Sequence, residues 1–121
     1  MLFDVERTTV AGRPALTVRG ELDLATAPQL AAAVDAMIAS APATFVVDLT
    51  PTAFLDSSGA RELVRLARRA AAEGIALHVV APRSNGPVRL TIDLLDLGAI
   101  VPIVGSAADI PARVARRDAA T

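Results

Sequence analysis

Two short stretches of apolar and β-branched residues open the chain, and a turn separates them. Residues 2–10 and 15–19 have the composition of strands. Residues 11–14 between them contain the Gly and Pro that are typical of turns. This pattern predicts an N-terminal β-hairpin.

Apolar residues at helical spacing follow the hairpin. Thr26 is a favourable N-cap, and Gln29 three residues later completes the sequence of a capping box. Pro28 falls in the first turn, where its missing N–H costs little. The apolar positions at this spacing are Leu30, Val34, Met37 and Ile38. We therefore expect a helix that begins near Thr26 and buries these side chains.

The middle of the chain predicts a strand, a loop and a second helix. Residues 44–49 form a short apolar run, which indicates a buried strand, and residues 50–55, which contain a proline, indicate a loop. A helix is expected from Ser57 to about Glu73, with an apolar stripe on one side and arginines on the other. Gly74 follows it, as is common at helix C-termini.

The last third of the chain continues the alternation of strands and helices. Residues 75–81 predict a strand, and a third helix opens at Ser84 or Asn85 and ends near Gly98. Residues 100–104 predict a last short strand.

A final helix is expected after that strand. It would start at Ser106 or Asp109, and Pro111 favours Asp109, because proline fits best early in a helix. The order of elements predicts an α/β fold, with a mixed, mostly parallel sheet of about five strands, about four helices and an N-terminal hairpin. We assign residues 1–115 to a single domain and expect residues 116–121 to be frayed.

The composition excludes several classes of function. Apolar residues make up 53% of the 121 residues, which is enough for one core. A net charge of −1 gives no electrostatic footprint for nucleic acid or an anionic membrane. No apolar run reaches the length of a membrane span, and no signal peptide is evident, so we expect a cytoplasmic protein without direct membrane contact.

The side chains that most cofactors and metals need are scarce. There is no cysteine and only one histidine, His78, which excludes thiolate catalysis and metal sites built from several Cys or His ligands. All twelve basic residues are Arg, so the lysine of a Walker loop or a Schiff base is also missing. We expect no cofactor.

Two polar loops are expected at the carboxyl edge of the sheet, where open α/β folds usually bind their partners. They are residues 21–26 and residues 54–59. In the second loop, Asp56-Ser57-Ser58 places three N-cap formers in a row. Gly59 weakens the first helical turn but would let a partner's backbone approach closely. Taken alone, this tetrapeptide is more simply explained as a helix cap.

Three segments at this spacing resemble the STAS-domain anti-sigma factor antagonists of bacteria. They are Gly20-Glu21-Leu22-Asp23, Val46-Val47-Asp48-Leu49 and Phe54-Leu55-Asp56-Ser57-Ser58-Gly59. The resemblance extends over nearly the whole chain and includes residues 88–98, which resemble the third helix of that family. It implies a STAS-like fold and a role in transcription regulation as an anti-sigma factor antagonist. STAS-like domains also serve as subunits of transporters and stress-sensing complexes, which is the alternative.

The resemblance also implies roles for single residues. Ser57, or as second choice Ser58, would be phosphorylated by the partner, an anti-sigma factor of the serine-kinase ATPase class. The unphosphorylated protein would bind that partner and free the sigma factor, and a serine phosphatase would restore this form. The expected partner-binding residues are Glu21, Asp23, Thr26, Phe54, Asp56, Ser57, Ser58, Gly59, Ala60 and Arg61.

One position departs from the family pattern. Ala60-Arg61 follow Gly59, where the family commonly has Leu-Gly. Arg61 adds a cation beside the site, which could pair with a phosphate or with an acidic patch on a partner. A solvated helix residue with Glu62 and Arg65 beside it is an equally good interpretation.

Two enzymatic alternatives are poorly supported. A serine hydrolase needs a base beside its nucleophile, but His78 lies within a predicted strand and no Gly-x-Ser-x-Gly motif is present. A phospho-acceptor receiver domain would use Asp48, but it also needs a lysine, which the chain lacks. We therefore expect no enzymatic activity.

Overall fold

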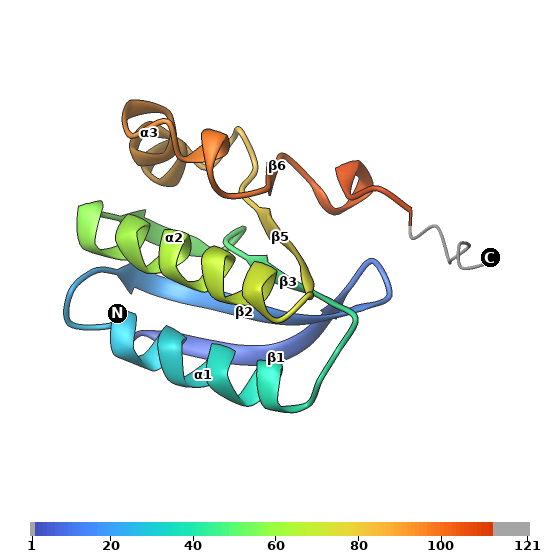
Figure 1. Ribbon diagram of the computed structural model, residues 1–121. Coiled ribbons are helices and arrows are strands. Elements are labelled where there is room, and N and C mark those ends of the chain that lie inside the picture. The colour runs from blue at the N-terminus through green and yellow to red at the C-terminus, as the bar shows by residue number, and fades with distance from the viewer. Residues whose placement is uncertain (1, 113–121) are drawn as a thin grey trace.

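The computed structural model describes residues 2–112, in which strands and helices alternate along the chain (Figure 1). The elements are β1 (Asp4–Val10), β2 (Arg13–Leu22), α1 (Ala27–Ala39), β3 (Thr44–Asp48), β4 (Thr52–Leu55), α2 (Ser57–Ala72), β5 (Ala76–Val80), α3 (Gly86–Leu94) and β6 (Ile103–Val104). Two short 3-10 helices, Leu97–Ala99 and Ala107–Asp109, follow α3 and β6.

The strands form one mixed sheet. Its order is β1-β2-β3-β5-β6, with β4 attached to β2 beside this path. Only β1 and β2 are antiparallel, and the remaining pairs are parallel. The predicted α/β fold with an N-terminal hairpin is confirmed. Within residues 2–112 the sheet has six strands rather than five, and there are three α-helices rather than four.

The prediction of a loop over residues 50–55 is wrong, because its last four residues form β4. This strand pairs with the last three residues of β2, whereas β3 pairs with residues 15–17 of the same strand. The Thr52 hydroxyl donates a hydrogen bond of 2.7 Å to the Val18 carbonyl oxygen and anchors the start of β4. Strand β2 does not end at Arg19, as predicted, but continues to Leu22. Within this extension Gly20 has a φ of 95°, and a register shift follows it.

The helices cover one face of the sheet, and α1 and α2 lie side by side on it (Figure 1). Helix α1 buries the four residues that the periodicity predicts, although it begins at Ala27. Phe45, on the central strand β3, is fully buried in the core that these helices share with the sheet. The other core residues contributed by α2 and α3 are Ala60, Leu63, Leu66, Ala70, Val88 and Ile92. The sequence periodicity therefore identifies the inner side of each helix.

The predicted final helix is wrong over the residues that the structure describes. Residues 107–109 form a 3-10 helix, and Ile110 has an extended backbone. Its side chain packs on the face of the sheet opposite the α-helices, and the Arg13 guanidinium donates a hydrogen bond of 2.7 Å to the Pro111 carbonyl oxygen. These contacts hold the segment extended against the sheet. The rest of that predicted helix and the predicted frayed tail, residues 116–121, lie outside the described residues.

Helix α3 and strand β6 are both shorter than predicted. The helix stops at Leu94, and Asp96 then adopts a left-handed backbone with a φ of 50°. A 3-10 turn takes up the next residues, so the chain joins the sheet only at Ile103. The segment up to Gly98 that the sequence predicts as one helix is therefore divided between two elements.

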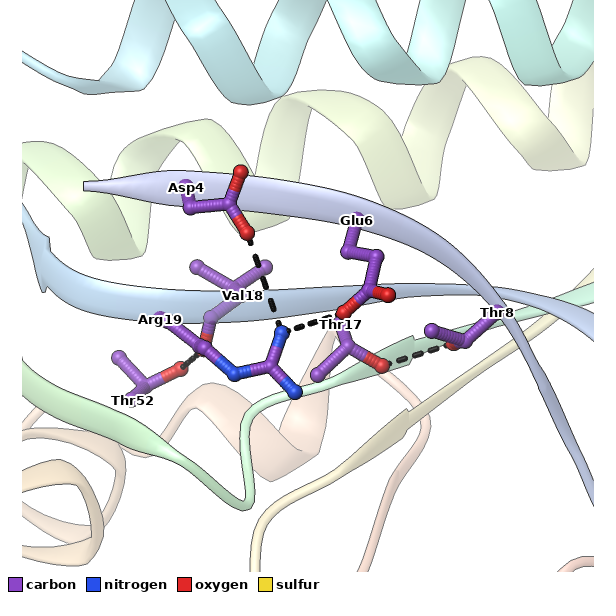
Figure 2. A network of polar contacts seen from close by, with 7 residues as sticks. All are labelled: Asp4, Glu6, Thr8, Thr17, Val18, Arg19 and Thr52. Atoms are coloured by element: carbon purple, nitrogen blue, oxygen red, sulfur yellow. Dashed lines mark hydrogen bonds and ion pairs between the residues drawn. The ribbon is translucent and has the colours of Figure 1, made fainter.

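The open part of the sheet surface carries polar side chains from β1 and β2. Figure 2 shows the Arg19 guanidinium between the carboxylates of Glu6 and Asp4, at 2.7 and 3.8 Å. The hydroxyls of Thr8 and Thr17 form a cross-strand hydrogen bond of 2.7 Å beside them. Exposed ion pairs of this kind contribute little stability, but they keep the edge of the sheet hydrophilic.

His78 lies on β5, on the face opposite the helices. Its register partner, Val46, belongs to the smaller apolar cluster that Ile110 covers. The Nδ1 atom is buried, and no group in residues 2–112 forms a hydrogen bond with it. Burial, and then the positive charge of Arg13, lower the pKa of the imidazole from 6.5. The fold therefore favours the neutral form of His78 more strongly than the unfolded chain does.

We expect the stability of the protein to fall as the pH decreases below about 6.5. In that range the unfolded chain binds a proton at His78 before the folded chain does, and this favours unfolding until the lowered folded-state pKa is passed. Urea unfolding at pH 7.0 and 5.5 would measure the change. A His78→Gln variant should lose most of it, because His78 is the sole histidine. The same loss of stability in both proteins would contradict this explanation.

Candidate functional site

Asp56 caps the amino end of α2. Its backbone is extended, and its Oδ1 atom accepts a hydrogen bond of 2.8 Å from the N–H of Gly59. Its carbonyl oxygen accepts a second one, of 2.9 Å, from the N–H of Ala60. Ser57 and Ser58 are therefore the first two residues of the helix, and the cap is Asp56.

The two serines differ in accessibility. Ser57 is exposed and Ser58 is half-buried. Among the residues that the structure describes, neither hydroxyl has a hydrogen-bond partner. The Ser57 hydroxyl is thus exposed at the surface, at a position where the helix dipole and unpaired N–H groups favour a negative charge.

The neighbouring loop, residues 23–26, is held together by its own polar groups. Asp23 Oδ1 accepts hydrogen bonds from the N–H groups of Ala25 and Thr26, at 3.0 and 3.1 Å. The Thr26 hydroxyl donates to the Glu21 carbonyl oxygen at 2.7 Å and accepts from the Asp23 N–H at 2.9 Å. The expected capping box with Gln29 is wrong, because the Thr26 side chain bonds back into the loop and does not cap α1.

Gly59 lies where the start of α2 packs against the end of β2. The Asp56 N–H donates to the Leu22 carbonyl oxygen at 3.3 Å. A Cβ atom on Gly59 would lie 2.4 Å from that same oxygen and 2.8 Å from the Leu55 side chain. The close approach that a glycine permits is therefore made by the chain's own strand β2. The expectation that Gly59 admits a partner's backbone is wrong for the folded chain, in which Gly59 is buried.

The predicted partner-binding residues divide by exposure. The exposed ones are Glu21, Phe54, Ser57 and Arg61, the half-buried ones are Asp23, Thr26, Asp56 and Ser58, and the buried ones are Gly59 and Ala60. Ala60 is 2% exposed and packs in the hydrophobic core, so a partner cannot contact its side chain directly. Leu24, in the first loop, is 74% exposed and does not belong to the expected partner-binding residues.

The structure does not bring together the groups that the alternative chemistries need. His78 lies on the sheet face opposite α2, the helix that begins with Ser57, so it is not placed to act as a base. The Asp48 carboxylate accepts hydrogen bonds from the N–H and the hydroxyl of Thr50, within its own turn. In the described part of the chain, no group of three or more acidic, His or Cys side chains is arranged to hold a metal ion.

Comparison with known families identifies the fold. A family model described as Mlab, STAS domain, matches residues 6–103, and the chain belongs to this family. The STAS-like fold implied by the sequence motifs is confirmed. No curated protein sequence matches the chain significantly. Over residues 2–112, no helix combines the length and apolar character needed to cross a membrane.

Solved structures with the same fold include proteins of known class. An anti-sigma factor antagonist from Mycobacterium paratuberculosis is 29% identical, covers 89% of this chain and 90% of its own, and has a TM-score of 0.77. The antagonist SpoIIAA in its unphosphorylated form is 24% identical, with coverages of 85% and 88% and a TM-score of 0.61. The Bacillus cell fate determinant SpoIIAA in its phosphorylated form is 22% identical, with coverages of 85% and 91% and a TM-score of 0.54. The resemblance to anti-sigma factor antagonists seen in the sequence is confirmed.

Proposed function

We propose that this chain is an anti-sigma factor antagonist, which binds an anti-sigma factor of the serine-kinase ATPase class and is released when Ser57 is phosphorylated. The observation that carries the proposal is the exposed Ser57 hydroxyl at the start of a capped helix. The similarity of this chain to the mycobacterial antagonist over most of both chains also supports the proposal. A serine phosphatase would return the protein to its binding form.

The surroundings of Ser57 suit a switch that leaves the fold unchanged. A phosphoserine adds about −1.5 to −2 charge. At the first position of α2 that charge meets the positive end of the helix dipole, so the folded chain tolerates it. Phosphorylated and unphosphorylated SpoIIAA both share this fold, which agrees with such a mechanism. The effect of the phosphate would therefore appear in the complex with the partner.

The remaining exposed residues would form the contact surface around Ser57. Glu21 on β2 and Phe54 on β4 are register partners, both are exposed, and Phe54 is 44% exposed. Leu24 adds an apolar side chain from the neighbouring loop. A partner that covers these groups would also cover the Ser57 hydroxyl, so binding and phosphorylation would use the same surface.

Phosphate transfer from the partner tests this proposal directly. The purified chain is mixed with the host's ATP-dependent anti-sigma kinase and radiolabelled ATP, and we expect the chain to become labelled. The Ser58→Ala variant should still be labelled, and the Ser57→Ala variant should not. The reverse result would identify Ser58 as the acceptor. If the chain stays unlabelled and co-purifies from its host with a membrane permease complex, the proposed function is wrong. Mass spectrometry of the protein from its host should find phosphate on the peptide with Ser57.

A further inference from the structure

Ser57 and Arg61 lie on the same side of α2. They are four positions apart (i, i+4) in a regular helix, and both side chains are exposed. Side chains at this spacing are neighbours, with Cβ atoms about 5–6 Å apart. A guanidinium group can therefore reach a group attached to the Ser57 oxygen without any change in the backbone.

The nearby carboxylates have other partners. Glu62 is mostly buried and pairs with Arg65 at 3.2 Å. The carboxylates of Asp56 and Asp23 accept hydrogen bonds from backbone N–H groups of their own loops. Within residues 2–112, no carboxylate lies at ion-pair distance from Arg61. In the unmodified protein Arg61 is thus the available cation beside the acceptor serine.

We propose that Arg61 is the counter-ion, within the same chain, of a phosphate on Ser57. This inference rests on the proposed function for the presence of the phosphate. Guanidinium and phosphate form charge-assisted, often bidentate hydrogen bonds, and here the two groups are already neighbours. The pair stabilises the dianionic phosphate in the free protein. A partner that approaches the phosphorylated chain must displace Arg61 or bury the ion pair, and this opposes rebinding.

Phosphorus NMR of the full chain tests the pair without a kinase or a partner. Phosphoserine is placed at position 57 during translation, and the phosphate resonance is titrated with pH. In Arg61→Gln the midpoint should move to higher pH than in the wild type, because the dianion loses its nearby cation. The shift should shrink in 1 M NaCl, and Arg61→Lys should give an intermediate midpoint.

Arg68→Gln is the matched control. Arg68 is also an exposed arginine of α2, but it lies eleven residues beyond Ser57, about 16 Å along the helix axis. Its substitution changes the net charge equally and should leave the midpoint unchanged. Equal midpoints for the wild type and Arg61→Gln, or an equal shift in Arg68→Gln, would overturn the proposal. Neither result depends on whether the host phosphorylates the chain, so failure of this inference is distinct from failure of the proposed function.

Discussion

Substituting Asp for Ser57 should weaken binding to the anti-sigma factor by roughly hundreds- to thousands-fold. A partner that covers position 57 must displace Arg61 from the added carboxylate, and an uncompensated buried charge costs about 3–5 kcal/mol. Ser57 is exposed in the free chain, so the added carboxylate stays hydrated until the partner covers it. The penalty therefore falls on the complex. Calorimetry or surface plasmon resonance with the purified partner would measure the change in Kd.

Two variants separate the position of the charge from its presence. Ser57→Ala removes the hydroxyl without adding charge, and it should bind about as tightly as the wild type while failing to accept phosphate. Ala72→Asp adds the same charge at the other end of α2, about 22 Å from Ser57, and should bind almost normally. If Ser57→Asp bound as tightly as these two variants, a charge at Ser57 would not be the switch.

The fold was predictable wherever a local pattern coincided with a long element. Helix α2 was expected from Ser57 to about Glu73, and it runs from Ser57 to Ala72. Gly74, which was expected to end it, has a φ of 72°. A cap, an apolar stripe and a terminal glycine all lie within one segment, so no distant contact is needed to define this helix.

Strand β4 could not be predicted in the same way. It has four residues, follows a proline, and is exposed at Ala53 and Phe54. What makes it a strand is parallel pairing with residues 20–22, about thirty positions earlier in the chain. That pairing depends on β2 continuing through Gly20, whose positive φ and register shift no local pattern reveals.

The motif predicted a helix start at the second loop, and the structure has one there, but several residues of the two loops make other local contacts than expected. Three N-cap formers stand in a row at the start of α2, and the backbone geometry assigns the cap to Asp56. Thr26 has the sequence of a capping box, but the Glu21 carbonyl oxygen competes successfully for its hydroxyl. Such competition between local hydrogen bonds depends on the path of the loop, which the sequence alone does not specify.

Gly59→Ala should destabilise the fold by about 1–3 kcal/mol, the usual cost of forcing an extra carbon into a packed site. The new Cβ would lie 2.4 Å from the Leu22 carbonyl oxygen, and that atom belongs to a paired strand that cannot easily move. Alanine is the better helix former by about 1 kcal/mol, but that gain is too small to offset the clash. Chemical denaturation with urea would measure the loss.

Gly86→Ala is the control for this substitution. Gly86 also lies in the first turn of a helix, α3, but a Cβ there would meet nothing within 4 Å. Its replacement should leave stability unchanged or raise it slightly, because alanine restricts the unfolded chain more. Equal changes in the free energy of unfolding for the two substitutions would show that the close contact with Leu22 does not make Gly59 necessary for stability. If Gly59→Ala also weakens partner binding in the folded protein, the junction between β2 and α2 positions Ser57 for the partner.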